Sequence, residues 1–392
     1  MNTRPVLDSY TGPFALSASF NNDNSHFSVA LYDGFRVFNS RTAELTLARE
    51  FGGGIGSVEM LGITRYMALV GGGRQPKFPQ NKVRNLSPQD VLEWDFVHAD
   101  RYEVQIWNDK TQVVAASLEF KTAVQRVRIS RTHLVVVLLN SVKIYKMRSP
   151  PVKIAEYETV DNPLGLCCLG TNIVAFPGLT PGQVKVFNLE AENITILPGH
   201  QSPLRAIGLS QNGDMVATAS RQGTLIRLWS YPSGSKITEF RRGIDPAVIL
   251  SLAFSPNGRI LAATSDKSTL HLFDVPHDPT AEPNPNTQRW GILAKVPLLP
   301  RQFSDTYASA TIKFELGDDP VGAAAERYST MNALIPGVPG GTPTKGLAGW
   351  LDDHTLVIVS AGKDARWERF IVGADSEGRC LVGREGWKRY LE

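Results

Sequence analysis

The segments LRAIGLSQNGDMVATASRQGTLIRLWS (residues 204–230) and AVILSLAFSPNGRILAATSDKSTLHLFDV (residues 247–275) follow one pattern. In each, apolar residues alternate with other residues, a turn containing Asn-Gly follows, and the alternation resumes twice with a second turn between. Alternation with a period of two, interrupted by Gly- and Asn-containing turns, is typical of antiparallel strands joined as hairpins. Each segment therefore predicts three consecutive β-strands, the third of which carries an aromatic residue near its end.

This aromatic ending recurs along the chain, for example as VKVFNL at 184–189. The aromatic positions are Phe38, Trp107, Tyr145, Phe187, Trp229 and Phe273, with Phe370 in RWERFIV (366–372) as a seventh candidate. Four of the first five separations lie between 38 and 44 residues, which is the length of one four-stranded propeller blade. The longer gaps correspond to one period plus an insertion.

We predict an all-β, single-domain, seven-bladed β-propeller with degenerate WD repeats over residues 10–392. The surplus residues are assigned to an insertion in blade two (82–103), a loop in blade six (276–303) and a flexible, Gly- and Pro-rich loop in blade seven (317–349). The Trp-Asp ending of standard WD repeats is absent, and only Gly199-His200 matches the Gly-His half of that signature. The alternative is a β-sandwich with coincidental spacing.

Composition excludes several classes of function. The net charge is only +3, so no global field attracts nucleic acid and any anion site must be local. Three cysteines cannot form a disulfide framework, the chain begins without a signal peptide, and the longest apolar run (134–139) is too short to span a bilayer. Catalytic elbows, phosphate loops and paired metal-ligand spacings are absent. We therefore expect a cytoplasmic, monomeric, non-enzymatic protein without cofactor or metal.

Two adjacent arginines stand out in FRRG (240–243), at the predicted end of the outer strand of blade five. Neighbouring strand residues point to opposite faces of a sheet, so Arg241 and Arg242 are placed to serve two pockets, one on each side. Gly243 would let the backbone turn sharply and approach a ligand closely.

Hydroxyl and basic residues flank each arginine in the predicted blades. On the side of Arg241 these residues are His200, Thr218, Ser220, Thr224 and Arg227. On the side of Arg242 they are Ser265, Lys267, Thr269 and His271. A guanidinium fork with hydroxyl donors around it suits phosphate oxygens. The alternative is that the hydroxyls close turns and the basic residues cap strand faces, but the duplication around an arginine pair favours two anion sites.

The chain resembles the PROPPIN family, the phosphoinositide-binding propellers of autophagy, over most of its length. Besides FRRG, the resemblance rests on FNNDNSHFSVALYDGFRVFN (20–39), LVGGGRQPKFPQNKV (69–83), NPLGLCCL (162–169), GQVKVFNL (182–189), ATASRQGTLIRLW (217–229) and FSPNGRILAATSDKSTLHLF (254–273). The ending RCLVGREGWKRYLE (379–392) is similar to the shorter Hsv- and WIPI-type branch. The resemblance implies two rim sites, formed by the two residue sets above, for phosphatidylinositol 3-phosphate and 3,5-bisphosphate.

The resemblance also implies a membrane-insertion loop after the third strand of blade six. Its counterpart here carries Trp290, Ile292 and Leu293 between Arg289 and Lys295. Apolar residues beside cations are suited to the interface of an anionic bilayer. The alternative is a surface loop whose apolar residues fold back onto the blade.

Family resemblance implies peripheral binding to preautophagosomal, endosomal and vacuolar membranes, and a contact between blades one to three and the lipid-transfer protein of autophagy. The insertion 82–103 departs from the family pattern and mixes Leu92, Trp94 and Phe96 with acidic residues, which suits either a partner groove or an extra ribbon. The alternative function is a protein–protein scaffold propeller that does not bind lipid.

Overall fold

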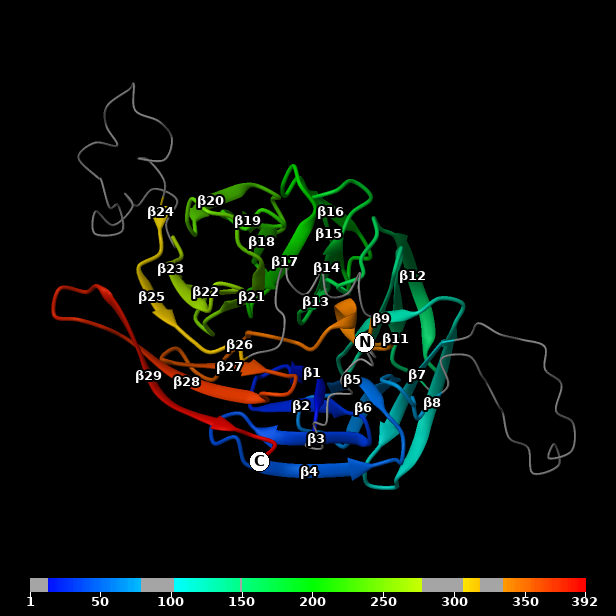
Figure 1. The fold of residues 1–392 in the computed structure, drawn as a ribbon. Coiled ribbons are helices and arrows are strands. Elements are labelled where there is room, and N and C mark those ends of the chain that lie inside the picture. The colour runs from blue at the N-terminus through cyan, green and yellow to red at the C-terminus, as the bar shows by residue number, and fades with distance from the viewer. Residues whose placement is uncertain (1–12, 79–101, 149, 277–305, 318–333) are drawn as a thin grey trace, which may run out of the picture.

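The computed structural model describes residues 13–78, 102–148, 150–276, 306–317 and 334–392. In these residues the chain forms seven sheets arranged around a central axis (Figure 1). Each sheet contains four antiparallel strands, and one of them has an additional fifth strand. The predicted all-β, seven-bladed propeller is confirmed. No helix of the described residues is long and apolar enough to cross a membrane.

Each of the first four blades is a meander whose strands pair in chain order. Blade one contains β1 (Ala15–Phe20), β2 (His26–Leu31), β3 (Gly34–Asn39) and β4 (Leu45–Glu50). Blade two contains β5 (Ile55–Met60), β6 (Tyr66–Gly71), β7 (Tyr102–Asn108) and β8 (Val113–Phe120). Blade three contains β9 (Val124–Ile129), β10 (His133–Leu138), β11 (Ser141–Lys146) and β12 (Val152–Glu158). Blade four contains β13 (Cys168–Leu169), β14 (Ile173–Pro177), β15 (Val184–Asn188) and β16 (Ile194–Leu197).

In the last three blades, one short strand joins the sheet of a neighbouring blade. Blade five contains β17 (Leu204–Leu209), β18 (Met215–Ser220), β19 (Leu225–Ser230) and β20 (Lys236–Arg241). Blade six contains β21 (Ile249–Phe254), β22 (Ile260–Ser265), β23 (Thr269–Asp274) and β25 (Ala310–Lys313), and blade seven contains β26 (Leu347–Trp350), β27 (Thr355–Ser360), β28 (Arg366–Ala374) and β29 (Cys380–Arg389). Between β23 and β25, the short strand β24 (Thr306–Tyr307) pairs in parallel with β20 and adds a fifth strand to blade five.

The recurring aromatic residue lies on the third strand of every blade, as the repeat predicts. Six of the seven aromatics are buried, and Trp107 on β7 is half-buried. Phe273 of blade six stacks on Phe240 of blade five, with ring centroids 4.9 Å apart. Because large apolar side chains dominate core energetics, the buried aromatic residues stabilise the packing of one blade against the next.

The ring closes where blade one meets blade seven, and among the described residues no strand is shared between these two blades (Figure 1). Tyr390 packs edge-on against Phe27 and Phe38, with ring centroids 5.2 and 5.1 Å away. The indole N–H of Trp367 donates to the carbonyl of Ser40 (2.8 Å). Side-chain packing and isolated hydrogen bonds therefore hold the two ends of the propeller together.

Part of the blade-seven insertion differs from the flexible loop that composition predicts. Residues 334–349 include the 3-10 turn η3 (Pro339–Gly341), the buried Val338 and strand β26. The carbonyl of Pro336 accepts a hydrogen bond from Gly73 (3.0 Å). A Cβ on Gly72 would lie 2.5 Å from that carbonyl. The glycine run of blade two therefore lets a segment of blade seven cross directly over its backbone, which composition alone did not reveal.

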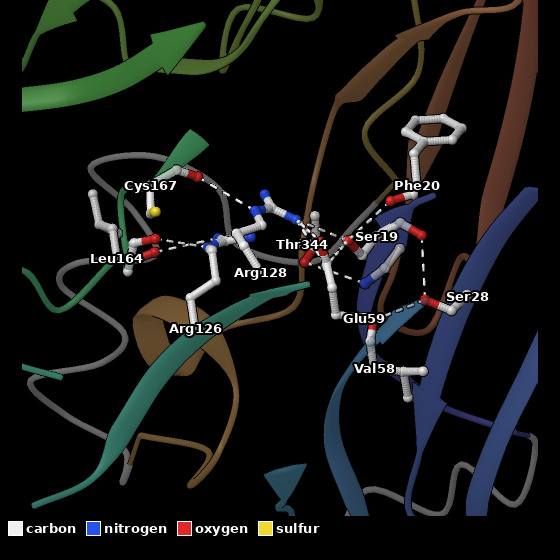
Figure 2. Close-up of polar contacts among 12 residues, drawn as sticks. Ser19, Phe20, Ser28, Val58, Glu59, Arg126, Arg128, Leu164, Cys167 and Thr344 are labelled. Atoms are coloured by element: carbon white, nitrogen blue, oxygen red, sulfur yellow. Dashed lines mark hydrogen bonds and ion pairs between the residues drawn. The ribbon is translucent and has the colours of Figure 1, made fainter. Parts of the chain in front are cut away.

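A polar network crosses the central channel between blades one to four (Figure 2). Arg128 on β9 donates from Nη1 to both carboxylate oxygens of Glu59 on β5, at 2.9 and 2.8 Å. Ser19 on β1 also donates to Glu59 (2.7 Å), and Arg128 Nε donates to the carbonyl of Cys167 (3.3 Å). Burial disfavours the charged form of Arg128, but the adjacent Glu59 carboxylate outweighs this effect and raises the arginine pKa.

A second arginine of β9, Arg126, points into the same channel (Figure 2). Its Nε donates to the carbonyl of Gly165 (2.7 Å) and its Nη2 to that of Leu164 (3.2 Å). Burial, reinforced by the neighbouring positive charge of Arg128, lowers the pKa of Arg126 to about 10. The network thus places two guanidinium groups near a single carboxylate. Glu59 therefore compensates positive charge at the contact between blades two and three.

Candidate anion-binding rim of blades five and six

The arginine pair lies at the edge of blade five, where it meets blade six. Strand β20 ends at Arg241, and Arg242 follows it. The backbone N–H of Arg242 donates to the carbonyl of Thr224 (2.9 Å), so the chain stays bonded to blade five one residue beyond the strand. On its other side Arg241 is the backbone partner of Tyr307 in β24. Both arginines are half-buried.

Arg242 is directed toward blade six. Its Nε donates to the carbonyl of Gly223 (2.8 Å), and its Nη2 donates to the carbonyl of Asp245. Burial lowers the pKa of Arg242, while the charges of Asp266 and Asp245 favour its protonated form. The positive charge of Arg242 in turn adds to the effect of burial in lowering the pKa of His271, which lies in blade six. The charge of Arg242 thus acts on one residue of the second predicted set, whereas its hydrogen bonds go to the turn before β19 and to the connection after β20.

The second set forms one hydroxyl–imidazole chain. Ser265 Oγ and Thr269 Oγ1 are 2.8 Å apart, and Thr269 Oγ1 is 3.1 Å from His271 Nε2. The other ring nitrogen of His271 is 3.1 Å from Thr311 Oγ1 on β25. Ser265 and His271 are buried, whereas Lys267 is exposed at the tip of the turn. The structure thus joins Ser265, Thr269 and His271 in one chain of contacts, with Lys267 exposed on the turn between β22 and β23.

In the first set, His200 and Thr218 bond to each other inside blade five. His200 Nε2 lies 3.0 Å from Thr218 Oγ1 and 3.1 Å from the Thr218 carbonyl. Because a carbonyl only accepts, the Nε2 proton is assigned to this contact. The indole N–H of Trp229 also donates to Thr218 Oγ1 (3.0 Å), and Thr218 is fully buried. These contacts connect β18 to β19 and to the segment before β17 inside blade five.

Arg227 is tied to an acidic residue that the sequence analysis did not include. Its Nε donates to Glu239 Oε2 (2.7 Å), and its Nη1 donates to the carbonyl of Gly199 (2.7 Å). Burial alone would raise the pKa of Glu239, but the hydrogen bond and charge of Arg227 lower it. Arg227 therefore links β19 to β20 and to the connection before β17.

Ser220 and Thr224 lie at the two ends of the turn whose Gly223 and Thr224 carbonyls accept hydrogen bonds from Arg242. Ser220 is buried at the end of β18, and Thr224 is half-buried just before β19. The turn between them matches that of blade six, because Gly223 N donates to the Ser220 carbonyl (3.0 Å) and Ser268 N donates to the Ser265 carbonyl (3.1 Å). Two equivalent turns thus flank the connection that carries Arg242.

Gly243 does not use the conformational freedom that the sequence suggested. Its φ is outside the left-handed region in which a side chain would be strained. An added Cβ would meet no heavy atom within 4 Å. The left-handed positions of the two flanking turns are Gly223, with φ +61°, and Ser268, with φ +56°.

The buried histidines of the two sets are neutral at physiological pH. Burial lowers the pKa of His200 to about 4, and the charge of Arg227 acts in the same direction. Burial and then Arg242 lower the pKa of His271 to about 4. A neutral imidazole donates from one nitrogen and accepts at the other, so the positive charge of this rim comes from arginine and lysine.

Three residues of this region were missed in the sequence, namely Glu239, Tyr307 and Thr311, and Trp229 was predicted only as a blade aromatic. Glu239 is the cross-strand partner of Arg227, so a hairpin register would have found it. Tyr307 and Thr311 follow the long blade-six insertion, and no local signal places them beside Arg241 and His271. Trp290, Ile292 and Leu293 of that insertion lie outside the described residues, as does most of the blade-two insertion.

Comparison with known proteins assigns the family. The family profile described as PROPPIN matches residues 89–316. The chain belongs to the PROPPIN family. It is 47% identical to SVP1-like protein 2 of Emericella nidulans, over 85% of this chain and 99% of that protein. It is 36% identical to SVP1-like protein 2 of Neurospora crassa, over 100% of this chain and 99% of that protein.

Solved structures agree with the fold. Kluyveromyces lactis Hsv2 with a complete loop 6CD superposes with a TM-score of 0.70 at 21% identity, covering 96% of this chain and 99% of that one. A complex of KlAtg21 with the coiled coil of AgAtg16 gives a TM-score of 0.62 at 18% identity, covering 96% and 99%. PROPPINs are phosphoinositide-binding, non-enzymatic propellers of autophagy. Among the described residues, no group of three His, Cys, Asp or Glu side chains is placed to hold a metal ion.

Proposed function

We propose that this PROPPIN binds phosphatidylinositol 3-phosphate and phosphatidylinositol 3,5-bisphosphate through two separate rim pockets and thereby docks edge-on to membranes. The observation that carries the proposal is the placement of two consecutive arginines at one blade seam. Arg242 is bonded into the turn facing blade six, whereas Arg241 lies between β19 and β24 in blade five. In this proposal, one strand end supplies a cation to each side.

Pocket two comprises Arg242, Ser265, Lys267, Thr269 and His271. Arg242 supplies a half-buried positive charge, and the exposed Lys267 supplies a second one at the pocket mouth. The Ser265–Thr269 contact leaves hydroxyl hydrogens that can reorient toward phosphate oxygens. Hydrogen bonds from ionised donors to phosphate are shorter and stronger than neutral ones, so Arg242 is the principal determinant of this pocket.

Pocket one comprises Arg241, His200, Thr218, Ser220, Thr224 and Arg227. Arg241, Ser220 and Thr224 are assigned to the phosphates, since they lie at the end of the strands beside the seam. His200 and Thr218 form the buried brace behind them. Arg227, already paired with Glu239, contributes positive potential and holds β19 against β20.

Two moderate headgroup contacts on one rigid rim give strong membrane binding, because capture of the second lipid is intramolecular. The blade-six loop with Trp290, Ile292 and Leu293, which is outside the described residues, supplies an apolar contact at the bilayer interface in this proposal. The target membranes are those of nascent autophagosomes, endosomes and the vacuole.

At these membranes the propeller recruits autophagy proteins, among them the lipid-transfer protein, through loops of blades one to three. The complex of KlAtg21 with the coiled coil of AgAtg16 supports the idea that a propeller of this fold can hold a protein partner. The insertion 82–103 is assigned to this partner surface, and the working unit is a monomer.

Liposome flotation tests the lipid-binding proposal. The Arg241→Thr, Arg242→Thr double variant should keep the wild-type fold and lose binding to vesicles containing phosphatidylinositol 3-phosphate. The matched control is Arg65→Thr with Arg131→Thr, which removes the same charge from exposed turns at the opposite end of the blades. This control should float like the wild type.

Retained flotation of the folded double arginine variant would refute the pocket assignment. Equal flotation of the wild type with phosphatidylinositol and with its 3-phosphate would instead favour the protein scaffold that does not recognise phosphoinositides.

A further inference from the structure

We propose that Ile244 is an apolar membrane contact built into the rim between the two pockets, an inference that rests on the proposed function. Ile244 lies in the connection between β20 and β21, two residues after Arg242. Its side chain is 68% exposed. Asp245 and Pro246, which follow it, are exposed as well, so the whole tip faces solvent.

The connection that carries Ile244 is held at both ends. Before it, Arg242 is bonded to Gly223 through its side chain and to Thr224 through its backbone. After it, Ala247 N donates to the Gln222 carbonyl (3.2 Å). The Arg242 guanidinium also bonds the Asp245 carbonyl, directly beyond Ile244. The isoleucine therefore projects from a braced tip, so its insertion into lipid would lose little conformational entropy.

Blade six also fixes the far end of this connection. Val248 N donates to Asp266 Oδ1 (2.9 Å), and Asp266 N donates to the Val248 carbonyl (2.9 Å). Ile244 is therefore positioned by the two turns that flank the two proposed pockets, one from each blade. Any surface whose phosphates reach both arginines must face the tip between them.

The charges around the tip favour a lipid surface over an apolar protein groove. Arg221 and Lys267 are exposed on the two flanking turns, and the arginine pair adds two further cations. The acidic residues of the same tip are Asp245 and Asp266, so positive charge predominates among the charged residues named here. An apolar residue ringed by cations matches the interface of an anionic bilayer.

Exposure alone does not identify a contact, because single exposed apolar residues are common on protein surfaces. The chain supplies its own comparison in Ile63, which is 76% exposed in the turn between β5 and β6. That turn lies at the opposite end of the blades from Ile244, because second strands begin there and end at the arginine rim. The two isoleucines match in chemistry and exposure and differ in position.

Vesicle binding and soluble headgroup binding separate the role of Ile244 from that of the arginines. We expect Ile244→Ser to weaken binding to vesicles of phosphatidylcholine with phosphatidylinositol 3-phosphate about 10-fold, equivalent to about 1.4 kcal/mol. Its affinity for soluble inositol 1,3-bisphosphate should equal that of the wild type. Ile63→Ser should leave both affinities unchanged, and all three proteins should share one melting temperature.

Tryptophan substitution provides a direct readout of depth. Ile244→Trp should gain fluorescence that brominated acyl chains quench when the protein binds phosphatidylinositol 3-phosphate vesicles. Ile63→Trp should gain fluorescence that these chains do not quench.

Three outcomes would overturn the inference: wild-type vesicle affinity in Ile244→Ser, an equal loss for soluble headgroup and vesicle, or no more quenching in Ile244→Trp than in the wild type on the same vesicles. In each case the wild type could still bind vesicles through its arginines. Failure of wild-type flotation would instead reject the proposed function itself.

Discussion

At the scale of single residues, the rim is organised by hydrogen bonds within the protein. Arg242 is bonded to two carbonyls, and His200 and His271 are each held by threonine hydroxyls. Side chains fixed in this way lose less conformational entropy when a ligand arrives. The proposed pockets are therefore preorganised. The two glycines of the rim, Gly223 and Gly243, should differ in how much their replacement by alanine destabilises the fold.

Gly243→Ala should leave stability within about 0.5 kcal/mol of the wild type, because its Cβ would meet no atom within 4 Å. Gly223→Ala should destabilise the fold by about 2 kcal/mol or more. Its Cβ would lie 1.7 Å from the Ala247 carbonyl, and its φ is +61°. Chemical denaturation of both variants measures the difference, and equal stability of the two would contradict it.

This contrast marks a limit of sequence reasoning at the residue scale. Gly243 follows two arginines, which suggested that this position needs the backbone freedom of glycine. The left-handed glycine is instead Gly223, in the preceding turn. Hydroxyl and basic residue types could be read from the repeat, because Ser220 and Ser265 occupy equivalent turns. Their partners could not, because the contact of Thr311 with His271 depends on a chain that returns after a long insertion.

At the scale of strands, hydrogen bonds from the two histidines join neighbouring elements. His200 binds β18 from the connection before β17, and His271 joins β23 to β25. Both imidazoles are neutral in the fold because burial lowers their pKa values to about 4. Protonation is consequently linked to unfolding.

The pH dependence of stability follows from this linkage. Between the unfolded histidine pKa of 6.5 and the folded value of about 4, the unfolded chain binds more protons. The free energy of unfolding should therefore fall as pH falls through this window, by up to about 1.4 kcal/mol per pH unit for each histidine. Urea unfolding near neutral pH and in mild acid measures this slope.

The His200→Gln, His271→Gln double variant should show a shallower slope. A residual dependence should remain, since burial also lowers the pKa of His133. If the double variant kept the full wild-type slope, the two histidines would not be the groups that titrate.

Strand order was predictable from the sequence, whereas contacts between distant segments were not. The aromatic residues of third strands recur at blade length because each blade must pack against the next. The parallel pairing of β24 with β20 and the crossing of 334–341 over Gly72 have no periodic signal. Both place residues of long insertions against elements far away in the chain.

At the scale of the whole molecule, side chains join neighbouring blades of the ring. The Glu59–Arg128 pair links blades two and three inside the channel, and Ser19 connects it to blade one (Figure 2). Its exposed fractions of 9% for Glu59 and 22% for Arg128 mean that water only partly solvates the pair.

Glu59→Gln should destabilise the propeller by about 3 kcal/mol, because removal of one partner leaves an uncompensated charge. Arg126 already lies beside Arg128, so two guanidinium groups would then repel each other. Glu59→Gln combined with Arg128→Met should recover most of the loss. Thermal and urea unfolding of the three proteins measure this, and wild-type stability of Glu59→Gln would show that the pair contributes little.

The central claim is that adjacent arginines serve two independent pockets at one rim. Titration calorimetry with soluble inositol 1,3-bisphosphate tests it most directly, because the number of bound headgroups is measured without a membrane. The account predicts two headgroups per wild-type chain, one for Arg241→Thr, one for Arg242→Thr and none for the double variant. One headgroup per wild-type chain, or complete loss in either single variant, would contradict it.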